Sequence, residues 1–176
     1  SRTAMHLYVH VPFCRKKCVY CGFASARPGP GDIAAYVRTV IREMGLRAPL
    51  VQGRRMQSMF LGGGTPSLLA PVHLQRILGA AGRYFGWEDD AEITLEANPD
   101  SVHTAHQVRA WRDMGITRIS LGVQSLDPEV LRFLGRGHTP AQAGRAVQCL
   151  QGAGMDNIGL DLIWGIPGQD VGSWLY

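Results

Sequence analysis

Arg118-Ile-Ser-Leu-Gly-Val-Gln124 is the stretch that decides the fold of this 176-residue chain. Successive side chains of a β-strand point to opposite faces, so every second residue of this run shares a face. One face is apolar (Ile119, Leu121, Val123) and the other is small or polar (Ser120, Gly122, Gln124). Strands covered by helices on both faces are almost continuously apolar, so the polar face predicts a strand that lines a ligand cavity.

The runs on either side of this stretch repeat its alternation. In the earlier run, Ile93 and Leu95 oppose Thr94, Glu96 and Asn98. In the later run, Ile158, Leu160 and Leu162 oppose Gly159 and Asp161. Two further β-rich runs come first in the chain, so we predict five strands, at residues 7–11, 58–61, 92–97, 118–123 and 158–163.

Helical patterns separate these runs. Apolar residues at helical spacing predict helices over residues 33–44, with Asp32 as N-cap, and over residues 73–85 and 104–114. Asp127-Pro128 and Thr139-Pro140 each place a cap residue before a proline, which predicts two more helix starts. Five β-then-α steps imply an α/β fold with a parallel sheet, either doubly wound or a partial barrel. The polar face favours a partial (β/α) TIM-type barrel of about five βα units.

The chain shows no linker that would divide it. We therefore expect residues 1–176 to form one core domain. Residues 170–176 begin another helical pattern, with Asp170 as a possible cap, and a complete binding barrel needs at least one more strand. The sequence is therefore expected to be truncated before the last barrel strand and any C-terminal domain.

Charge and hydropathy exclude several classes of protein. The net charge of +4 comes from arginines spread along the chain, which does not indicate nucleic acid as a partner. The only two lysines, Lys16 and Lys17, follow Arg15, and this run is either a solvated loop or an attractor of anions. No apolar stretch approaches the ~20 residues of a membrane span, and no signal peptide is evident, so we expect a cytoplasmic protein without an integral membrane segment.

Three of the four cysteines are closely spaced directly after the first predicted strand, as Cys14-x3-Cys18-x2-Cys21. In a cytosolic chain this spacing indicates metal binding rather than disulfides. Three thiolates can hold an iron–sulfur cluster with one iron left open, or they can form a zinc site completed by His6 or His10. The neighbouring aromatic residues Phe13 and Tyr20 favour the cluster. Cys149 has helical spacing with apolar residues and is expected to pack in the core.

Six motifs in order resemble one known family. They are Tyr8-Val-His-Val-Pro-Phe-Cys14 with the cysteines that follow it, Phe60-Leu-Gly-Gly-Gly-Thr-Pro-Ser67, Glu92-Ile-Thr-Leu-Glu-Ala-Asn-Pro99, Ile119-Ser-Leu-Gly-Val-Gln-Ser125, Leu134-Gly-Arg-Gly-His138 and Gly159-Leu-Asp-Leu-Ile-Trp-Gly-Ile-Pro-Gly168. Together they resemble the radical S-adenosylmethionine (SAM) superfamily. Within it they resemble the HemN/HemW branch of oxygen-independent coproporphyrinogen III oxidases and haem chaperones.

The resemblance implies both cofactors and their ligands. It implies that Cys14, Cys18 and Cys21 hold a 4Fe-4S cluster whose open iron chelates SAM, and that one-electron reduction can cleave SAM. The positions that match SAM contacts of the family are Tyr8, Gly63, Gly64, Thr65, Glu96, Gln124, Arg136 and Asp161. Carboxylates can accept from the SAM ammonium or a ribose hydroxyl, and a guanidinium can pair with a carboxylate.

The same resemblance leaves two main functions open. A haem chaperone would bind haem as cargo and deliver it to haem-acceptor proteins, whereas the oxidase would decarboxylate porphyrinogen propionates. The oxidases carry a further cysteine two residues after the third cluster cysteine, where this chain has Phe23, which favours the chaperone. Either function implies an electron donor for the cluster. Gly22 departs from the aspartate usual in the chaperones and leaves a related methyltransferase or haem-degrading enzyme as a third possibility.

Overall fold

The computed structural model describes residues 4–51 and 53–175, and its centre is one parallel sheet of five strands. The strands are β1 (Met5–Val11), β2 (Met56–Gly63), β3 (Trp87–Ala97), β4 (Arg118–Gln124) and β5 (Ile158–Leu162). The helices are α1 (Asp32–Arg47), α2 (Pro71–Phe85), α3 (Ala105–Asp113), α4 (Pro128–Phe133), α5 (Pro140–Gly152) and α6 (Val171–Leu175). Short 3₁₀ helices are η1 (Ala48–Val51), η2 (Pro66–Leu68) and η3 (Pro99–Ser101).

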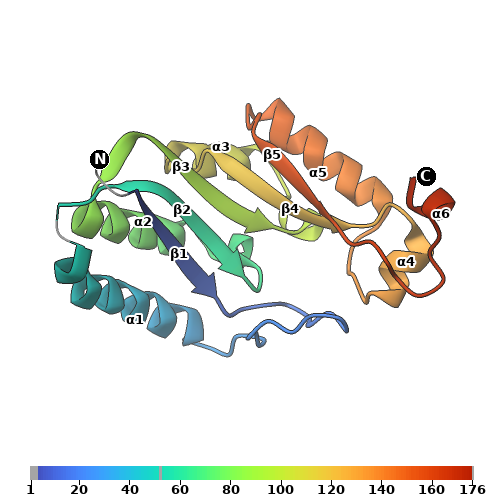
Figure 1. The fold of residues 1–176 in the computed structure, drawn as a ribbon, viewed down its shortest axis with the longest axis horizontal. Helices are drawn as coiled ribbons and strands as arrows, with labels where there is room; N and C mark the ends of the chain where they lie inside the picture. Colours follow the sequence, from blue (N-terminus) through green and yellow to red (C-terminus); the bar gives the residue numbers. More distant parts are fainter. Residues whose placement is uncertain (1–3, 52, 176) are drawn as a thin grey trace.

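The order of the strands decides between the two predicted architectures. Neighbours in the sheet are also neighbours in the chain, in the order β1-β2-β3-β4-β5, without the reversal of a doubly wound sheet. Right-handed crossovers in this order keep the connecting helices on one side, which is the arrangement of a (β/α) barrel wall. Figure 1 shows the arrowheads of all five strands pointing toward one end of the sheet. The α/β, partial-barrel prediction is confirmed.

The two faces of the sheet separate as the alternation predicts. Leu61, Leu95 and Ile119 lie in register on three successive strands, and each is fully buried in the core. Apolar residues of α1, α2, α3 and α5 pack on this face. The prediction is wrong for the apolar face of β5, since Leu160 and Leu162 are about half exposed (50% and 47%) at the edge of the sheet.

The predicted N-cap residues agree with the structure except at α1, and α2 starts at Pro71, two residues before the predicted start. Thr104, Asp127 and Thr139 are the N-caps of α3, α4 and α5, and each accepts a hydrogen bond from a backbone N–H. The predicted cap Asp32 is instead the first residue of α1. The N-cap is Gly31, whose positive φ of 84° suits glycine, and the Asp32 carboxylate accepts from the Gly29 N–H at 2.7 Å.

The strands are longer than the predicted runs at several ends. The largest difference is in β3, which begins at Trp87 rather than Glu92 because Trp87 pairs with Met56 on β2. The predicted C-terminal helix is present as α6, and Tyr176 lies outside the described residues. Among residues 4–51 and 53–175, none of the helices combines the length and the apolar character that crossing a membrane requires.

Candidate functional site

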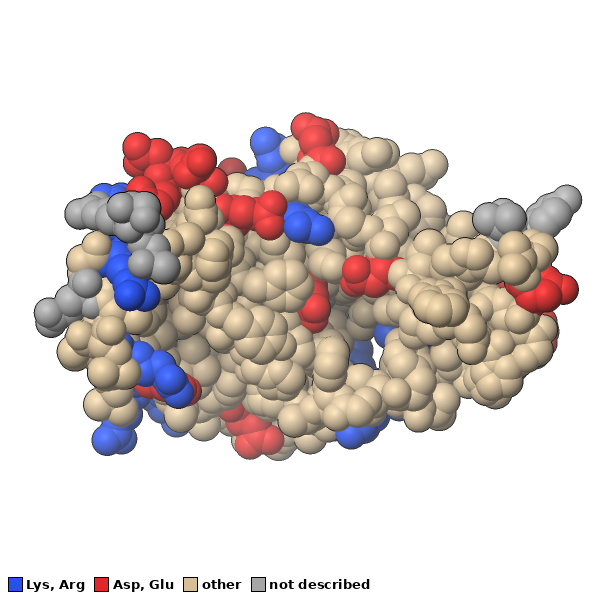
Figure 2. All heavy atoms as spheres, in the orientation of Figure 1, with Lys and Arg blue, Asp and Glu red and all other residues tan. Residues whose placement is uncertain are grey.

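A cavity of about 500 Å³ lies on the polar face of the sheet, between the strand ends and the cysteine loop. In the orientation of Figure 1, Figure 2 shows acidic side chains beside a hollow and basic side chains deeper within it. Ten of the eleven predicted site residues line the cavity: Cys14, Cys18, Cys21, Gly63, Gly64, Thr65, Glu96, Gln124, Arg136 and Asp161. Six separate segments of the sequence therefore contribute to one site.

Backbone hydrogen bonds fix the loop that carries the cysteines. The Cys14 N–H donates to the Ala26 carbonyl at 3.0 Å, and the Ala26 N–H donates to the Pro12 carbonyl at 2.9 Å. A further bond joins the Cys21 N–H to the Cys18 carbonyl at 3.2 Å. All four cysteines are free thiols, and the three of this loop are each partly accessible. The loop thus presents three unpaired sulfur donors to the cavity.

The glycine turn after β2 holds the cysteine loop in place. A Cβ on Gly64 would lie 2.5 Å from the Phe13 carbonyl oxygen, so only glycine allows this approach. The Gly64 N–H donates to the Val11 carbonyl at 2.8 Å and the Thr65 N–H to the Phe13 carbonyl at 2.7 Å. Close packing of protein backbone therefore explains Gly64 in addition to any approach of a ligand.

A chain of polar contacts joins two of the cysteines across the cavity. The Thr65 hydroxyl donates to the Cys14 sulfur at 3.7 Å and accepts from the Asn98 side-chain amide at 3.2 Å. Arg136 donates to Asn98 Oδ1 at 2.7 Å and to the Cys18 sulfur at 3.5 Å. Hydrogen bonds to sulfur are among the factors that set the potential of an iron–sulfur cluster. Arg136, 118 residues from Cys18 in sequence, is thus a direct neighbour of a predicted ligand.

Glu96 is the carboxylate closest to the glycine turn. Its Oε2 accepts from the Gly63 N–H at 2.9 Å. Burial raises the pKa of Glu96, and the nearby Asp161 raises it further, while the Gly63 hydrogen bond and His10 oppose this shift. A partly desolvated carboxylate of this kind gains from a cationic ligand, because the cation restores the favourable surroundings lost on burial.

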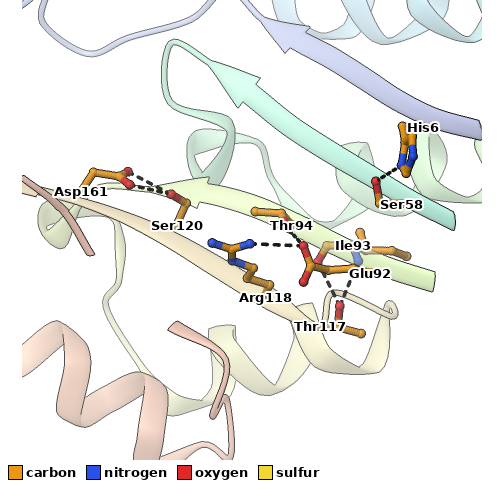
Figure 3. A network of polar contacts seen from close by, with 9 residues as sticks. All are labelled: His6, Ser58, Glu92, Ile93, Thr94, Thr117, Arg118, Ser120 and Asp161. Atoms are coloured by element: carbon orange, nitrogen blue, oxygen red, sulfur yellow. Dashed lines mark hydrogen bonds and ion pairs between the residues drawn. The ribbon is translucent and has the colours of Figure 1, made fainter. Parts of the chain in front are cut away.

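Asp161 and Gln124 complete the carboxyl ends of β4 and β5. Both oxygens of Asp161 lie within hydrogen-bonding distance of the Ser120 hydroxyl, at 3.1 and 2.9 Å, and Figure 3 shows this pair spanning the two strands. Gln124 is the only non-glycine residue of the described ranges with a positive φ (69°). Such conformations are sparsely populated and cluster at ligand sites.

Tyr8 is the one predicted site residue that does not line the cavity. Its ring stacks on Phe60, with centroids 6.1 Å apart and planes at 27°, and Phe60 does line the cavity. The Tyr8 hydroxyl lies 3.0 Å from His10 Nδ1, and burial followed by the charge of Glu96 raises the pKa of Tyr8. Tyr8 therefore lies behind Phe60 rather than at the wall itself.

The two histidines considered as the fourth ligand of a zinc site form hydrogen bonds with other groups. His10 Nε2 lies 2.8 Å from the Ala24 carbonyl, and His6 Nδ1 lies 2.8 Å from the Ser58 hydroxyl. Within the described parts of the chain, no three His, Cys, Asp or Glu side chains converge on a position for a single metal ion. His138 is buried against the Val123 carbonyl. Cys149 packs against the core, as predicted.

The cavity lining also contains residues that the prediction did not assign to the site, among them Phe60, Asn98, Arg118 and Ser120. Three of them lie on the predicted polar face, so the alternation carried a signal for them. Asn98 follows β3 directly and bridges Thr65 and Arg136, a role that no local pattern predicts.

The residues present fit the cofactors that the resemblance implies. Three free thiols line one cavity. They can ligate three irons of a 4Fe-4S cluster and leave the fourth iron without a protein ligand. The Arg136 Nε is buried without a hydrogen-bond partner among the described residues, and Glu96 is a partly buried carboxylate that lines the same cavity. An amino acid ligand with an ammonium and a carboxylate group would satisfy both.

Comparisons with known proteins agree with this site. The sequence profile of the radical SAM superfamily matches residues 8–174. The chain is 39% identical to the haem chaperone HemW of Escherichia coli (strain K12) over 168 residues, which are 95% of this chain and 44% of that protein. It is 42% identical to an oxygen-independent coproporphyrinogen III oxidase of Bradyrhizobium diazoefficiens, over 96% of this chain and 38% of that protein.

A solved structure resembles the fold closely. It is the radical SAM enzyme coproporphyrinogen III oxidase (HemN) of Escherichia coli, with a TM-score of 0.87 and 30% identity. The similarity covers 98% of this chain and 40% of that one. The chain thus spans less than half of each of these relatives, and both functional types are among them.

Proposed function

This chain belongs to the radical SAM superfamily, whose cofactors are a 4Fe-4S cluster and SAM, and we propose that it is the radical SAM core of a haem chaperone. In this proposal the protein binds haem as cargo and delivers it to acceptor proteins. The observation that carries it is the cavity in which Cys14, Cys18 and Cys21 meet the glycine turn and the polar strand ends. Thiolates need a reducing environment, so the proposal includes a cytoplasmic location.

The roles of the site residues follow from their contacts. Cys14, Cys18 and Cys21 would be the thiolate ligands, and the bound cluster would supply one electron to SAM. Arg136 and Thr65 would donate hydrogen bonds to ligand sulfurs, as they do to the free thiols.

The SAM contacts come from the glycine turn and from three strand ends. Glu96 would accept from the SAM ammonium, and the free donors of Arg136 would pair with its carboxylate. Asp161, held by Ser120, and Gln124 would accept from the ribose hydroxyls. Gly63, Gly64 and Thr65 would border the methionine end, and Tyr8 would support the wall through Phe60.

Phe23 supports the chaperone over the oxidase. It stands where the oxidases carry a further cysteine, and its side chain lines the cavity. Its ring meets His10 edge-to-face, with centroids 6.5 Å apart and an angle of 83°. An apolar ring here gives the cavity mouth an aromatic surface in place of a thiol, which suits a planar apolar cargo.

The second candidate is the oxygen-independent coproporphyrinogen III oxidase. The observation in its favour is the HemN structure, which superimposes on nearly the whole chain. In that case a porphyrinogen would be the substrate and its propionates would lose carbon dioxide.

The test uses the full-length protein, with its cluster reconstituted without oxygen. Haem binding and transfer to an apo-acceptor are measured beside 5'-deoxyadenosine formation with coproporphyrinogen III. We expect stoichiometric haem binding and transfer without decarboxylation. Deoxyadenosine release that depends on coproporphyrinogen III, together with loss of propionates, would refute the chaperone in favour of the oxidase.

The electron donor would dock at the cysteine loop. Arg15, Lys16 and Lys17 form an exposed basic run between two of the proposed ligands. Basic groups so close to the cluster favour an acidic redox protein, whose association would weaken as salt screens the charges.

A further inference from the structure

One row of paired residues crosses four strands of the polar face. Tyr8 pairs with Phe60, Phe60 with Thr94, and Thr94 with Arg118. Tyr8 and Phe60 form the stacked aromatic pair, and Arg118 lies at the other end of the row. Adjacent strands are about 4.8 Å apart, so Phe60 and Arg118 lie about 10 Å apart across the sheet. The row therefore offers an apolar surface and a cation at a fixed separation.

Arg118 has more hydrogen-bond donors than the protein uses. A guanidinium carries five N–H donors, and the one contact recorded for that of Arg118 among the described residues is to Glu92 Oε1, at 3.4 Å. Its Nε is buried without a partner, and the side chain lines the cavity. Figure 3 shows a single guanidinium nitrogen joined to Glu92. A buried donor normally finds a partner, so the free Nε of Arg118 indicates a ligand.

Glu92 does not neutralise Arg118 fully. Both side chains are about two-fifths exposed, and at this exposure an ion pair contributes little. Glu92 also accepts from the Thr94 hydroxyl at 3.2 Å, so its charge is shared between two donors. A carboxylate from a ligand could form a bidentate pair with the remaining nitrogens.

Arg118 is distant from the part of the cavity that is proposed for the carboxylate of SAM. It is the first residue of β4, four residues before Gly122, whose carbonyl accepts from Arg136 at 2.6 Å. At about 3.3 Å per residue this separation is about 13 Å. The only carboxylate of SAM is assigned to the cluster end of the cavity, so Arg118 is available for a second ligand.

We infer that Arg118 binds a carboxylate of a tetrapyrrole whose ring lies against Phe60. This inference rests on the proposed function and names the part of the cavity that would receive the cargo. Haem and coproporphyrin III both combine a planar ring with carboxylates, the two features that the aromatic pair and the guanidinium would bind.

The experiment compares acid and ester forms of the ligand on the full-length protein with its cluster reconstituted. Haem, haem dimethyl ester and coproporphyrin III are titrated against the wild type and Arg118→Gln. We expect the substitution to weaken haem binding about ten- to a hundredfold, as for loss of a charged hydrogen bond, and to leave ester binding unchanged. Arg132→Gln is the matched control, because Arg132 is an exposed arginine on α4 that pairs with Glu129.

A second variant gives a change of opposite sign. Glu92→Gln removes the competing carboxylate beside Arg118, so we expect it to strengthen haem binding. A purely structural role for the pair predicts that both variants weaken acid and ester alike. Equal losses for the two ligands, or no loss in Arg118→Gln, would overturn the inference while leaving the chaperone proposal intact.

The titrations also distinguish haem from a metal-free porphyrin as the ligand that supplies the carboxylate. Arg118-dependent binding of coproporphyrin III without haem binding would support the inference and contradict the chaperone. If the wild type binds neither tetrapyrrole, both the inference and the proposed function fail.

Discussion

Gly64→Ala is the sharpest test of how the glycine turn positions the cysteine loop. The added Cβ would lie 2.5 Å from the Phe13 carbonyl oxygen and 2.9 Å from the Phe13 carbonyl carbon and nitrogen. Ordinary van der Waals contact begins at 3.4 Å, so the shortest of these contacts is 0.9 Å too close. All three atoms belong to the backbone, which cannot rotate away. The residue before Cys14 must move instead.

The expected magnitude follows from this displacement. Inserting a methyl group into close-packed surroundings costs about 1–3 kcal/mol. The hydrogen bonds from the Gly64 and Thr65 N–H groups to Val11 and Phe13 would lengthen as well. We therefore expect the free energy of unfolding of the apoprotein to fall by about 1–3 kcal/mol, and cluster occupancy to fall because Cys14 is displaced.

Urea denaturation of the apoprotein and iron and sulfide content after reconstitution measure the two effects. Gly79→Ala is the matched control, since a Cβ on Gly79 of α2 meets no atom within 4 Å. The control is expected to stabilise the protein by about 0.5–1 kcal/mol and to keep full iron content. Wild-type stability and iron content in Gly64→Ala would refute the argument that the turn fixes the loop.

Three further predictions concern the ligands, the buried carboxylate and the basic run. Single alanine substitutions of the proposed ligands should abolish stable iron and sulfide binding, whereas Cys149→Ala should retain both; the substituted ligands are Cys14, Cys18 and Cys21. Glu96→Gln should stabilise the apoprotein in urea denaturation at pH 8 but not at pH 4. The reason is that a raised pKa means that the folded wild type loses stability as pH rises above the ordinary value of 4.5, and equal stability at pH 8 would contradict this. Charge reversal of Lys16 and Lys17 should slow reduction of the cluster by an acidic flavoprotein at low salt but not at high salt. Stopped-flow reduction rates that change neither with the substitutions nor with salt would exclude docking at the loop.

Local patterns were sufficient to predict part of the site, whereas Gly63, Gly64, Thr65 and Arg136 were expected only from the family resemblance. The alternation along β3 and β4 placed Glu96 and Gln124 on the cavity face, because the side-chain period of a strand is a property of the strand alone. The cysteine spacing likewise identified three donors in one loop. These predictions needed no knowledge of how distant segments meet.

Other features depend on tertiary contacts that the sequence does not encode locally. The donation from Arg136 to the Cys18 sulfur depends on the turn after α4, and the distance of Tyr8 from the cavity depends on its register with Phe60. Aspartate is a favoured N-cap residue, which is why Asp32 was predicted as the cap. Gly31 takes the cap position instead, with a positive φ that suits glycine. Arg118 lies on the predicted face, and only its unpaired donors in the structure distinguish it from its neighbours.

The strand order has a consequence for how the protein forms during synthesis. Each strand pairs with the strand made just before it, so every new β-then-α unit that leaves the ribosome finds its template already present. Assembly can then proceed from the N-terminus without waiting for a distant partner. At each stage, however, the newest strand presents an open edge until the next strand pairs with it. Slow translation of the next unit would therefore prolong the exposure of an aggregation-prone strand edge. Translational pauses between units would then lower the yield of folded protein.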